Sequence, residues 1–379
     1  MAEDVLEIEN LRLNFYTYEG VVEALDRVKL NLKKGETLGV VGETGCGKSV
    51  TGLSTLAIVL PPGRIEEGKV ILKTEQNPID LLSKNEEFLR RIRGRVISMI
   101  FQDPKSALNP VYTVGDQIIE VYFHHKRKEL IQRVIEQLDA SITGRKASFL
   151  SKHYKKIYQK MLKNPNAFSL RIQSKIPILR RYKRLLVNEA KKEAINILRA
   201  MKIPDPERVV DMYPHELSGG MAQRVVIAMA LACSPKILVA DEPTTNLDVT
   251  VQLQILQLIK ELKEEFSSSV IYVTHDMGVI AEMCDRVAVM YAGNVVEIGE
   301  VFEIFKNPLH PYTKGLLESI PRLGVPFKSI KGTVPSLIDP PKGCRFHNRC
   351  DYAMDICTKE KPNMVEVEKQ HFVQCFLYK

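Results

Sequence analysis

The stretch Thr37-Leu-Gly-Val-Val-Gly-Glu-Thr-Gly-Cys-Gly-Lys-Ser49 decides the fold. Its first five residues predict a buried strand, and the apolar-periodic residues from Val50 to Leu60 predict a helix that ends at Pro61-Pro62. In this strand–loop–helix context the glycines indicate a phosphate-binding loop (P-loop), because they let backbone N–H groups converge on phosphates. Lys48 is then expected to bridge the β- and γ-phosphates, and the hydroxyl of Ser49 to ligate Mg²⁺.

Two later stretches carry complementary chemistry. Leu217-Ser-Gly-Gly-Met221 opens a predicted helix, with Ser218 as its N-cap and two glycines that permit close approach to an anion. Ile237-Leu-Val-Ala-Asp-Glu242 is an apolar strand that ends in two acids. Asp241 can hold Mg²⁺ through its water shell, and Glu242 can polarise an attacking water as a general base or by orientation.

The remaining chain predicts a pattern of alternating elements. Residues 5–41 are typical of short strands and turns. Residues 114–232 are typical of helices, with breaks near Pro165, Pro177, Pro204 and Pro214. Further expected elements are strands at Val96–Phe101, Lys236–Ala240 and Val270–Val273, a helix at Val251–Phe266, and a hairpin of Arg286–Met290 with Val295–Ile298. The amino-acid composition becomes rich in proline and cysteine after Gly299, which indicates a domain boundary near residue 300.

The order of P-loop, helical segment, Leu-Ser-Gly-Gly and acidic strand end resembles the ATP-binding subunits of ABC transporters. The resemblance implies an α/β P-loop NTPase with a RecA-like core, an N-terminal antiparallel β subdomain, a helical signature subdomain and a small Cys-rich C-terminal domain. It also implies a catalytic set of Glu242, His275 and Gln102. In this family His275 would contact the γ-phosphate, although a lone histidine after a buried strand is more often structural. Gln102 would touch Mg²⁺ or the attacking water.

The same resemblance assigns the ATP-binding residues. They are Gly42, Glu43, Thr44, Gly45, Cys46, Gly47, Lys48, Ser49, Val50, Asp241, Ser218, Gly219, Gly220 and Met221. Met221 stands where most members of the family have glutamine, and Asn246-Leu-Asp248 fits the loop that crosses the dimer interface. The signature would complete the ATP site of a partner subunit, so the chain is expected to dimerise on ATP. Phe15 is expected to stack on adenine, with Tyr16 and Tyr18 as alternatives and a buried strand aromatic as the competing interpretation.

The C-terminal part resembles the extension of oligopeptide and dipeptide transporter ATPases, through residues 307–317 and a block of cysteines. We therefore expect a nucleotide-binding domain at 1–300, with its helical subdomain at about 103–232, and an extension at 301–379. Four thiolates can bind Zn²⁺ tetrahedrally or hold a [4Fe–4S] cluster. The resemblance favours the iron–sulfur cluster, with zinc or free thiols as alternatives. The ligands would be Cys344, Cys350, Cys357 and Cys375.

Composition bounds the remaining possibilities. The 379 residues are 45% hydrophobic and 26% charged, which is typical of a globular protein. No apolar run reaches about 18 residues, so no transmembrane helix is expected. The start lacks a basic region followed by an apolar one, so export is not expected. Any membrane association would then come through partners.

The charge is unevenly distributed. The net charge is +8, yet residues 126–193 alone hold 19 Lys and Arg against 5 Asp and Glu. This tract falls in a basic insertion at about 125–190, which makes the helical segment longer than the family's. A solvated helical hairpin is one interpretation, and contact with anionic lipid headgroups or an acidic cytoplasmic loop is another. Nucleic acid is the third, and no nucleic-acid partner is expected, because the tract has few aromatics for stacking on bases.

Together these features predict an ATP-hydrolysing subunit that energises import of di- and oligopeptides. It would pair with a second, different ATPase under two integral membrane permeases, at the cytoplasmic face of the membrane, and an extracytoplasmic binding protein would supply the solute. Import of an oligosaccharide or nickel is the alternative. A soluble ABC ATPase of ribosomes or DNA is disfavoured by the single P-loop, and an inactive subunit by the complete catalytic set.

Overall fold

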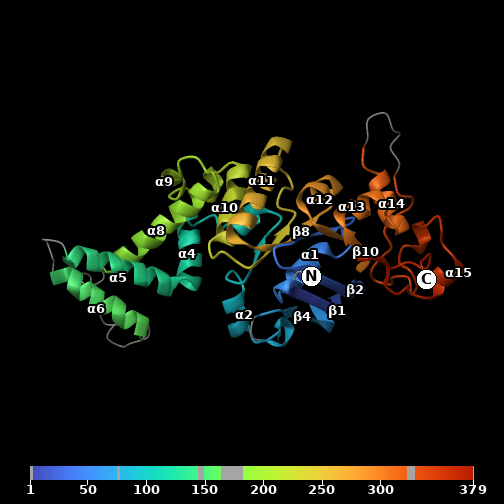
Figure 1. Cartoon of the computed structure of the whole chain (residues 1–379), viewed down its shortest axis with the longest axis horizontal. Helices are drawn as coiled ribbons and strands as arrows, with labels where there is room; N and C mark the ends of the chain where they lie inside the picture. The colour runs from blue at the N-terminus through green and yellow to red at the C-terminus, as the bar shows by residue number, and fades with distance from the viewer. Residues whose placement is uncertain (1–2, 75–76, 144–148, 164–181, 322–328, 379) are drawn as a thin grey trace. The chain divides into compact units, whose positions relative to one another are not determined.

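The computed structural model describes residues 3–74, 77–143, 149–163, 182–321 and 329–378. The chain forms two compact units. The first comprises Met1–Gln102 and Pro235–Lys379, and the second is Asp103–Ser234. Figure 1 shows the helices and strands of both units along the chain. Within the described ranges no helix is long and apolar enough to cross a bilayer.

The first unit opens with an antiparallel sheet of order β2-β1-β4-β5. Its strands are β1 (Asp4–Thr17), β2 (Gly20–Lys33), β4 (Gly63–Leu72) and β5 (Ile79–Asp80). Leu6 of β1 lies opposite Leu32 on one side and Leu72 on the other, so one row of leucines crosses three strands. The alternation of apolar and polar residues in β1 produces this sheet, because side chains two apart share a face.

The second sheet of this unit is mixed, with the order β11-β12-β10-β9-β3-β8-β7-β6. Its parallel strands are β3 (Thr37–Val41), β6 (Ile97–Ile100), β7 (Ile237–Asp241), β8 (Ser269–Thr274) and β9 (Arg286–Tyr291). β10 (Asn294–Glu300) returns antiparallel to β9 as the expected hairpin, and β12 (His371–Val373) and β11 (Val365–Glu368) follow. The C-terminal residues therefore extend the same sheet that holds the P-loop.

The first unit also contains helices. They are α1 (Lys48–Thr55), α2 (Glu86–Ile92), α11 (Val249–Phe266), α12 (Met277–Met283), α13 (Val301–Lys306), α14 (Pro311–Glu318) and α15 (Asp355–Lys359). Of these, α1, α12 and α13 contact strands of the mixed sheet. The helix expected to continue to Leu60 ends five residues earlier, because Ala57 adopts a left-handed φ of 52° that a helix cannot contain. Pro61-Pro62 therefore follows a turn and does not terminate the helix.

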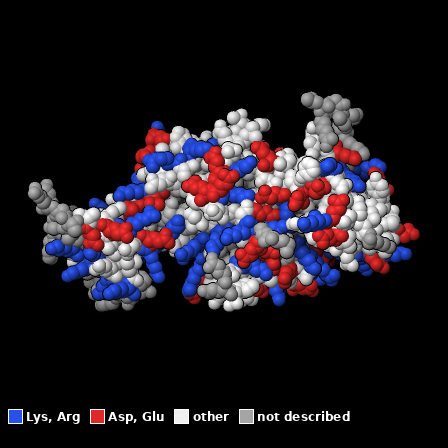
Figure 2. Space-filling model, viewed as in Figure 1, with Lys and Arg blue, Asp and Glu red and all other residues white. Residues whose placement is uncertain are grey.

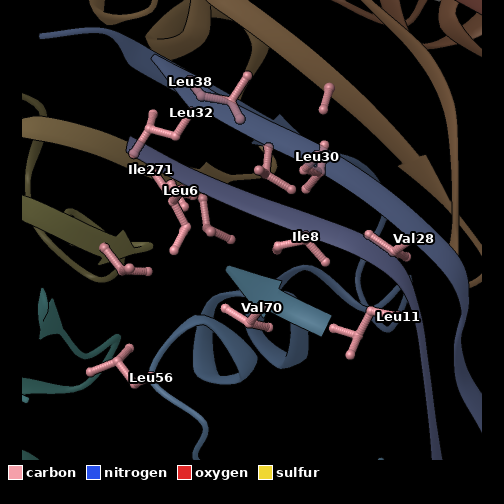
Figure 3. Close-up of a cluster of buried hydrophobic side chains, with 14 of the residues drawn as sticks. Leu6, Ile8, Leu11, Val28, Leu30, Leu32, Leu38, Leu56, Val70 and Ile271 are labelled. Carbon is pink, nitrogen blue, oxygen red and sulfur yellow. The ribbon is translucent and has the colours of Figure 1, made fainter. Parts of the chain in front are cut away.

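One hydrophobic cluster joins the two sheets of the first unit. It contains Leu6 and Val70 from the antiparallel sheet and Leu38 and Ile271 from the parallel strands (Figure 3). These four side chains are at most 3% exposed. The cluster fixes the start of β3 from both sides, and β3 in turn leads directly into the P-loop.

The second unit is helical. Its helices are α3 (Pro104–Ala107), α4 (Val114–His125), α5 (Arg127–Thr143), α6 (Phe149–Lys163), α8 (Tyr182–Ala200), α9 (Pro206–Val209) and α10 (Gly219–Leu231). α5 and α6 pack on each other through apolar residues such as Leu130, Val134 and Ile157, all at most 3% exposed. The basic insertion is thus helical where it is described, and the expected breaks at Pro165 and Pro177 lie outside the described residues.

Candidate active site

The P-loop lies between β3 and α1, where the sequence predicted it. Gly42 has no room for a side chain, because a Cβ there would lie 2.1 Å from the carbonyl oxygen of Met290. Gly45 has a left-handed φ of 80° and no heavy atom within 4 Å of a Cβ position. The loop is therefore packed on its inner side and open on the side of Thr44 and Gly45, which are both exposed. This open side is where a phosphate chain can approach the backbone.

Lys48 places a buried ammonium group inside the loop. The residue is 5% exposed, and its Nζ donates to the carbonyl oxygens of Gly42 at 2.8 Å and Glu43 at 3.1 Å. Neutral carbonyl oxygens do not cancel the positive charge of the ammonium group, so Lys48 can still attract the oxygens of a phosphate chain.

The other loop residues serve as structural spacers around this lysine. Gly47 begins α1 with a left-handed φ of 100°, and Val50 lies in the first turn of that helix. Burial raises the pKa of the Cys46 thiol to about 11, so this residue is a neutral spacer at physiological pH. Its Sγ lies within the space that a Cβ on Gly42 would need.

Oxygen donors meet beside the loop. The Ser49 hydroxyl donates to Oδ1 of Asp241 at 3.0 Å, and Asp241 is the last residue of the buried strand β7. Burial raises the pKa of the Asp241 carboxyl, with the neighbouring Glu242 adding to the effect and the Ser49 hydrogen bond opposing it. A hydroxyl and a carboxylate are hard oxygen ligands of the kind Mg²⁺ prefers, and a divalent cation would compensate the buried acid. These residues therefore fit the expected Mg²⁺ ion.

Glu242 is held by three side chains. Its Oε1 lies 3.1 Å from Nδ1 of His275, while its Oε2 accepts from Oγ1 of Thr245 at 2.9 Å and from Nε2 of Gln102 at 3.1 Å. The residue itself adopts a left-handed φ of 45°, and its backbone N–H donates to Val273. The structure thus brings together the three residues expected to be catalytic, from the ends of β6, β7 and β8.

The hydrogen bonds around Glu242 also set its charge. Burial alone would raise its pKa, but the hydrogen bonds from His275 and Thr245 outweigh burial and lower the pKa below the usual value for glutamate. The carboxylate is therefore ionised at neutral pH. An ionised carboxylate held from three sides at an open strand end can accept a proton from water.

The signature residues lie in the second unit. Ser218 caps α10, accepting from the backbone N–H of Met221 at 3.3 Å, as the sequence predicted. Ser218 and Gly219 are exposed, and Gly220 is half-buried at the start of the helix. The first turn of α10 therefore presents backbone donors and small residues, which is the arrangement an anion requires.

The three aromatic candidates for adenine differ in exposure. Phe15 packs against the main hydrophobic cluster, and Tyr16 donates its hydroxyl to Glu66 at 2.7 Å. Tyr18 follows β1 and is 97% exposed. The ring of Tyr18 is thus the one that is free on both faces.

The sequence analysis did not identify Thr245, Tyr312 or Arg349 as residues of the site. Thr245 follows Glu242 by only three residues, so its hydrogen bond could have been inferred from the turn. Glu43 of the P-loop contacts Tyr312 and Arg349, which lie about 270 and 306 residues further along the chain. No local pattern predicts contacts over such separations.

The iron–sulfur prediction is wrong. Among the described residues no group of three or more His, Cys, Asp or Glu side chains is placed to hold a metal ion. The four expected ligands, Cys344, Cys350, Cys357 and Cys375, are free thiols around an apolar hollow of about 10 Å³.

Burial explains why these cysteines act as packing groups. It raises the pKa of the Cys344 thiol to about 11 and also raises the pKa values of the Cys350 and Cys375 thiols. Cys344 and Cys350 pack against the hydrophobic cluster around Tyr312 and Phe346. The cysteine block therefore supports neither the [4Fe–4S] cluster nor the metal-binding role.

Comparison with known proteins decides the family. The ABC transporter family matches residues 25–245, and the family of the oligopeptide/dipeptide transporter C-terminal region matches residues 296–357. The chain belongs to the ABC transporter family. As an ABC transporter ATPase it carries the expected P-loop NTPase fold with mixed α/β sheets, and the prediction of this family from the motifs is confirmed.

Similar proteins extend over nearly the whole chain of this ABC transporter ATPase. A dipeptide transport ATP-binding protein of Bacillus subtilis is 43% identical over 99% of this chain and 95% of its own. An oligopeptide transport ATP-binding protein of Salmonella typhimurium is 40% identical over 95% of this chain and 90% of its own. A dimeric ATP-binding cassette solved with ADP and Pi has a TM-score of 0.52 at 25% identity, covering 78% of this chain and 98% of its own.

Replacing Glu242 by Gln tests the catalytic geometry. The amide keeps the size of the side chain but cannot accept the proton of water, so we expect ATP hydrolysis to fall about 100-fold or more while ATP binding persists. Steady-state hydrolysis and equilibrium ATP binding are measured on the same preparation. Glu264→Gln, at an exposed position of α11, is the control and should hydrolyse ATP at the wild-type rate. A Glu242→Gln variant with full activity would remove Glu242 from the mechanism.

Proposed function

We propose that this ABC transporter ATPase energises the import of di- and oligopeptides. The observation that carries the proposal is the complete hydrolytic set around the P-loop, in a chain whose C-terminal residues match the oligopeptide/dipeptide transporter family. The names of its similar proteins support peptides over the alternatives of nickel or oligosaccharides.

The chain's own residues supply the hydrolytic chemistry. The P-loop backbone and Lys48 would hold the phosphate chain. Ser49, Asp241 and Gln102 would hold Mg²⁺, which when bound would supply positive charge to the phosphate oxygens. A water hydrogen-bonded to Glu242 attacks the γ-phosphorus, and the bond from that phosphorus to the oxygen bridging the β-phosphate breaks. The water proton passes to the Glu242 carboxylate, and ADP and phosphate remain. His275 steadies the carboxylate and contacts the γ-phosphate, and Gln102 orients the water.

The site is completed by a partner in this proposal. The first turn of α10, from Ser218 to Met221, would contact the nucleotide held by the P-loop of a second ATPase, with Asn246–Asp248 at the interface. The dimeric cassette among the similar structures supports this arrangement. Adenine would stack on one of the aromatic rings at Phe15, Tyr16 and Tyr18. The 97% exposure of Tyr18 supports the Tyr18 ring over that of Phe15.

The chain is organised, in this proposal, as a nucleotide-binding domain at 1–300, with its helical subdomain at about 103–232, and an extension at 301–379. The end of β10 at Glu300 supports the boundary. The ATPase would sit at the cytoplasmic face of the membrane, beneath two permeases, and pair with a different ATPase. A binding protein outside the cell would deliver the peptide.

Reconstitution tests the peptide assignment. The chain is co-expressed with its permeases and partner ATPase, and the complex is placed in vesicles with the cognate binding protein. We expect ATP hydrolysis to rise several-fold when the binding protein carries a peptide. Nickel or an oligosaccharide loaded in the same way should leave the rate at its basal value. Stimulation by either of these, and none by peptides, would contradict the assignment.

A basic face of α6 supports a lipid contact. The lysines Lys152, Lys156, Lys160 and Lys163 are exposed, and their spacing places them on one side of the helix, opposite buried Ile157 and Met161. Figure 2 shows blue side chains over the segment of α5 and α6, with red ones among them. We propose that this face contacts anionic lipid headgroups near the permeases, because clustered lysines are attracted to such a surface.

Substituting the four lysines of α6 by Gln tests the lipid contact. We expect sedimentation with phosphatidylserine vesicles to fall toward the level seen with phosphatidylcholine. A control with equal loss of charge changes four exposed lysines of the first unit: Lys34, Lys69, Lys84 and Lys306. If the control loses as much binding as the α6 variant, or if neither changes, the α6 face is not a lipid contact.

A further inference from the structure

The C-terminal extension holds the P-loop at Glu43. Arg349 binds its carboxylate with two nitrogens, Nη1 to Oε2 at 2.7 Å and Nη2 to Oε1 at 3.1 Å. The backbone N–H of Glu43 donates to the hydroxyl of Tyr312 at 2.9 Å. Side chain and backbone of one loop residue are therefore both bound by the extension.

The two groups that hold Glu43 are rigid. The Arg349 side chain is 4% exposed, its Nε donates to the carbonyl of Lys331 at 2.8 Å, and its guanidinium lies 5.7 Å from the centre of the Tyr291 ring. Tyr312 is fully buried, with its ring 4.6 Å from that of Tyr291. This pair is thus unlike an exposed ion pair, whose side chains are free to move apart.

The contact acts on the group that meets the phosphates. The carbonyl of Glu43 accepts from Nζ of Lys48, so fixing Glu43 fixes one of the two acceptors that hold the lysine. The carboxylate of Glu43 is also a negative charge on a loop that must bind a polyanion. Arg349 compensates this charge, and without it the carboxylate would repel the phosphates.

We infer that Arg349 and Tyr312 are positioning residues of the P-loop, through which the C-terminal extension sets the affinity for ATP. The inference rests on the proposed ATP site. It gives the extension a role in nucleotide binding in addition to any contact with transporter partners. Neither residue touches the reacting atoms, so the effect is on binding of ATP and not on the rate of the bound complex.

Arg349→Met in the full chain tests the inference. We expect the Kd for ATP, measured by displacement of a fluorescent ATP analogue in the presence of Mg²⁺, to rise about tenfold, because a buried charged hydrogen bond is lost. The KM for ATP should rise in parallel while kcat at saturating ATP stays near the wild-type value. Arg349→Lys keeps the charge but loses the two-nitrogen geometry, so its affinity should be intermediate. Tyr312→Phe should weaken binding to a smaller extent.

A second substitution separates charge from structural damage. In the double variant Glu43→Gln with Arg349→Met the uncompensated carboxylate is gone, so we expect tighter ATP binding than in Arg349→Met alone. Lys361→Met is the matched control. Nζ of Lys361 in the extension donates to Oδ2 of Asp26 at 2.6 Å, and Asp26 lies outside the P-loop. Thermal unfolding of each variant checks that it is folded.

The outcomes are distinguishable. Unchanged ATP affinity in Arg349→Met overturns the inference, as does an equal loss in Lys361→Met or a double variant that binds no more tightly than Arg349→Met. A wild-type chain that binds no ATP would instead overturn the proposed ATP site itself.

Discussion

The buried ammonium group of Lys48 is the constraint around which the first unit is arranged. Its Nζ is held by the neutral carbonyl oxygens of Gly42 and Glu43, and its charge helps to lower the pKa values of the nearby Asp241 and Glu242 carboxyls. Taking a cation out of water is unfavourable unless it is compensated, and phosphate oxygens at the open side of the loop provide that compensation. The close packing of Gly42 on Met290 and the anchoring of Glu43 by the extension both serve to keep this lysine in place.

Parallel strands explain why the three residues expected to be catalytic lie together. The carboxyl ends of neighbouring parallel strands lie at one edge of a sheet, so residues that directly follow β6, β7 and β8 are brought close whatever their separation in the chain. Gln102, Glu242 and His275 occupy these positions. The sequence could place these residues together because each strand is a short apolar run and each residue expected to be catalytic comes one or two residues after its end. The strands expected from Thr37 onward, β3 and β6 to β10, agree with the structure to within two residues at each end for the same reason.

Other features depend on contacts that no local pattern encodes. The extension adds β11 and β12 to the core sheet and places Arg349 against Glu43, a pairing of residues about 306 positions apart. The cysteine block was interpreted as a metal site from residue type, yet burial in an apolar hollow makes its thiols packing groups. The early end of α1 follows from one residue, Ala57, which has a left-handed backbone conformation. The amino-acid composition does not predict this conformation.

The most direct measurement of the central claim is equilibrium binding of MgATP to a Lys48→Ala variant. If the buried ammonium group of Lys48 binds the phosphates of ATP, the affinity for ATP should fall about 100-fold or more, since a buried charge-assisted contact is removed. The thermal unfolding midpoint should not decrease, because the substitution also removes a poorly compensated buried charge. An affinity equal to that of the wild-type chain, in a variant that remains folded, would contradict the account.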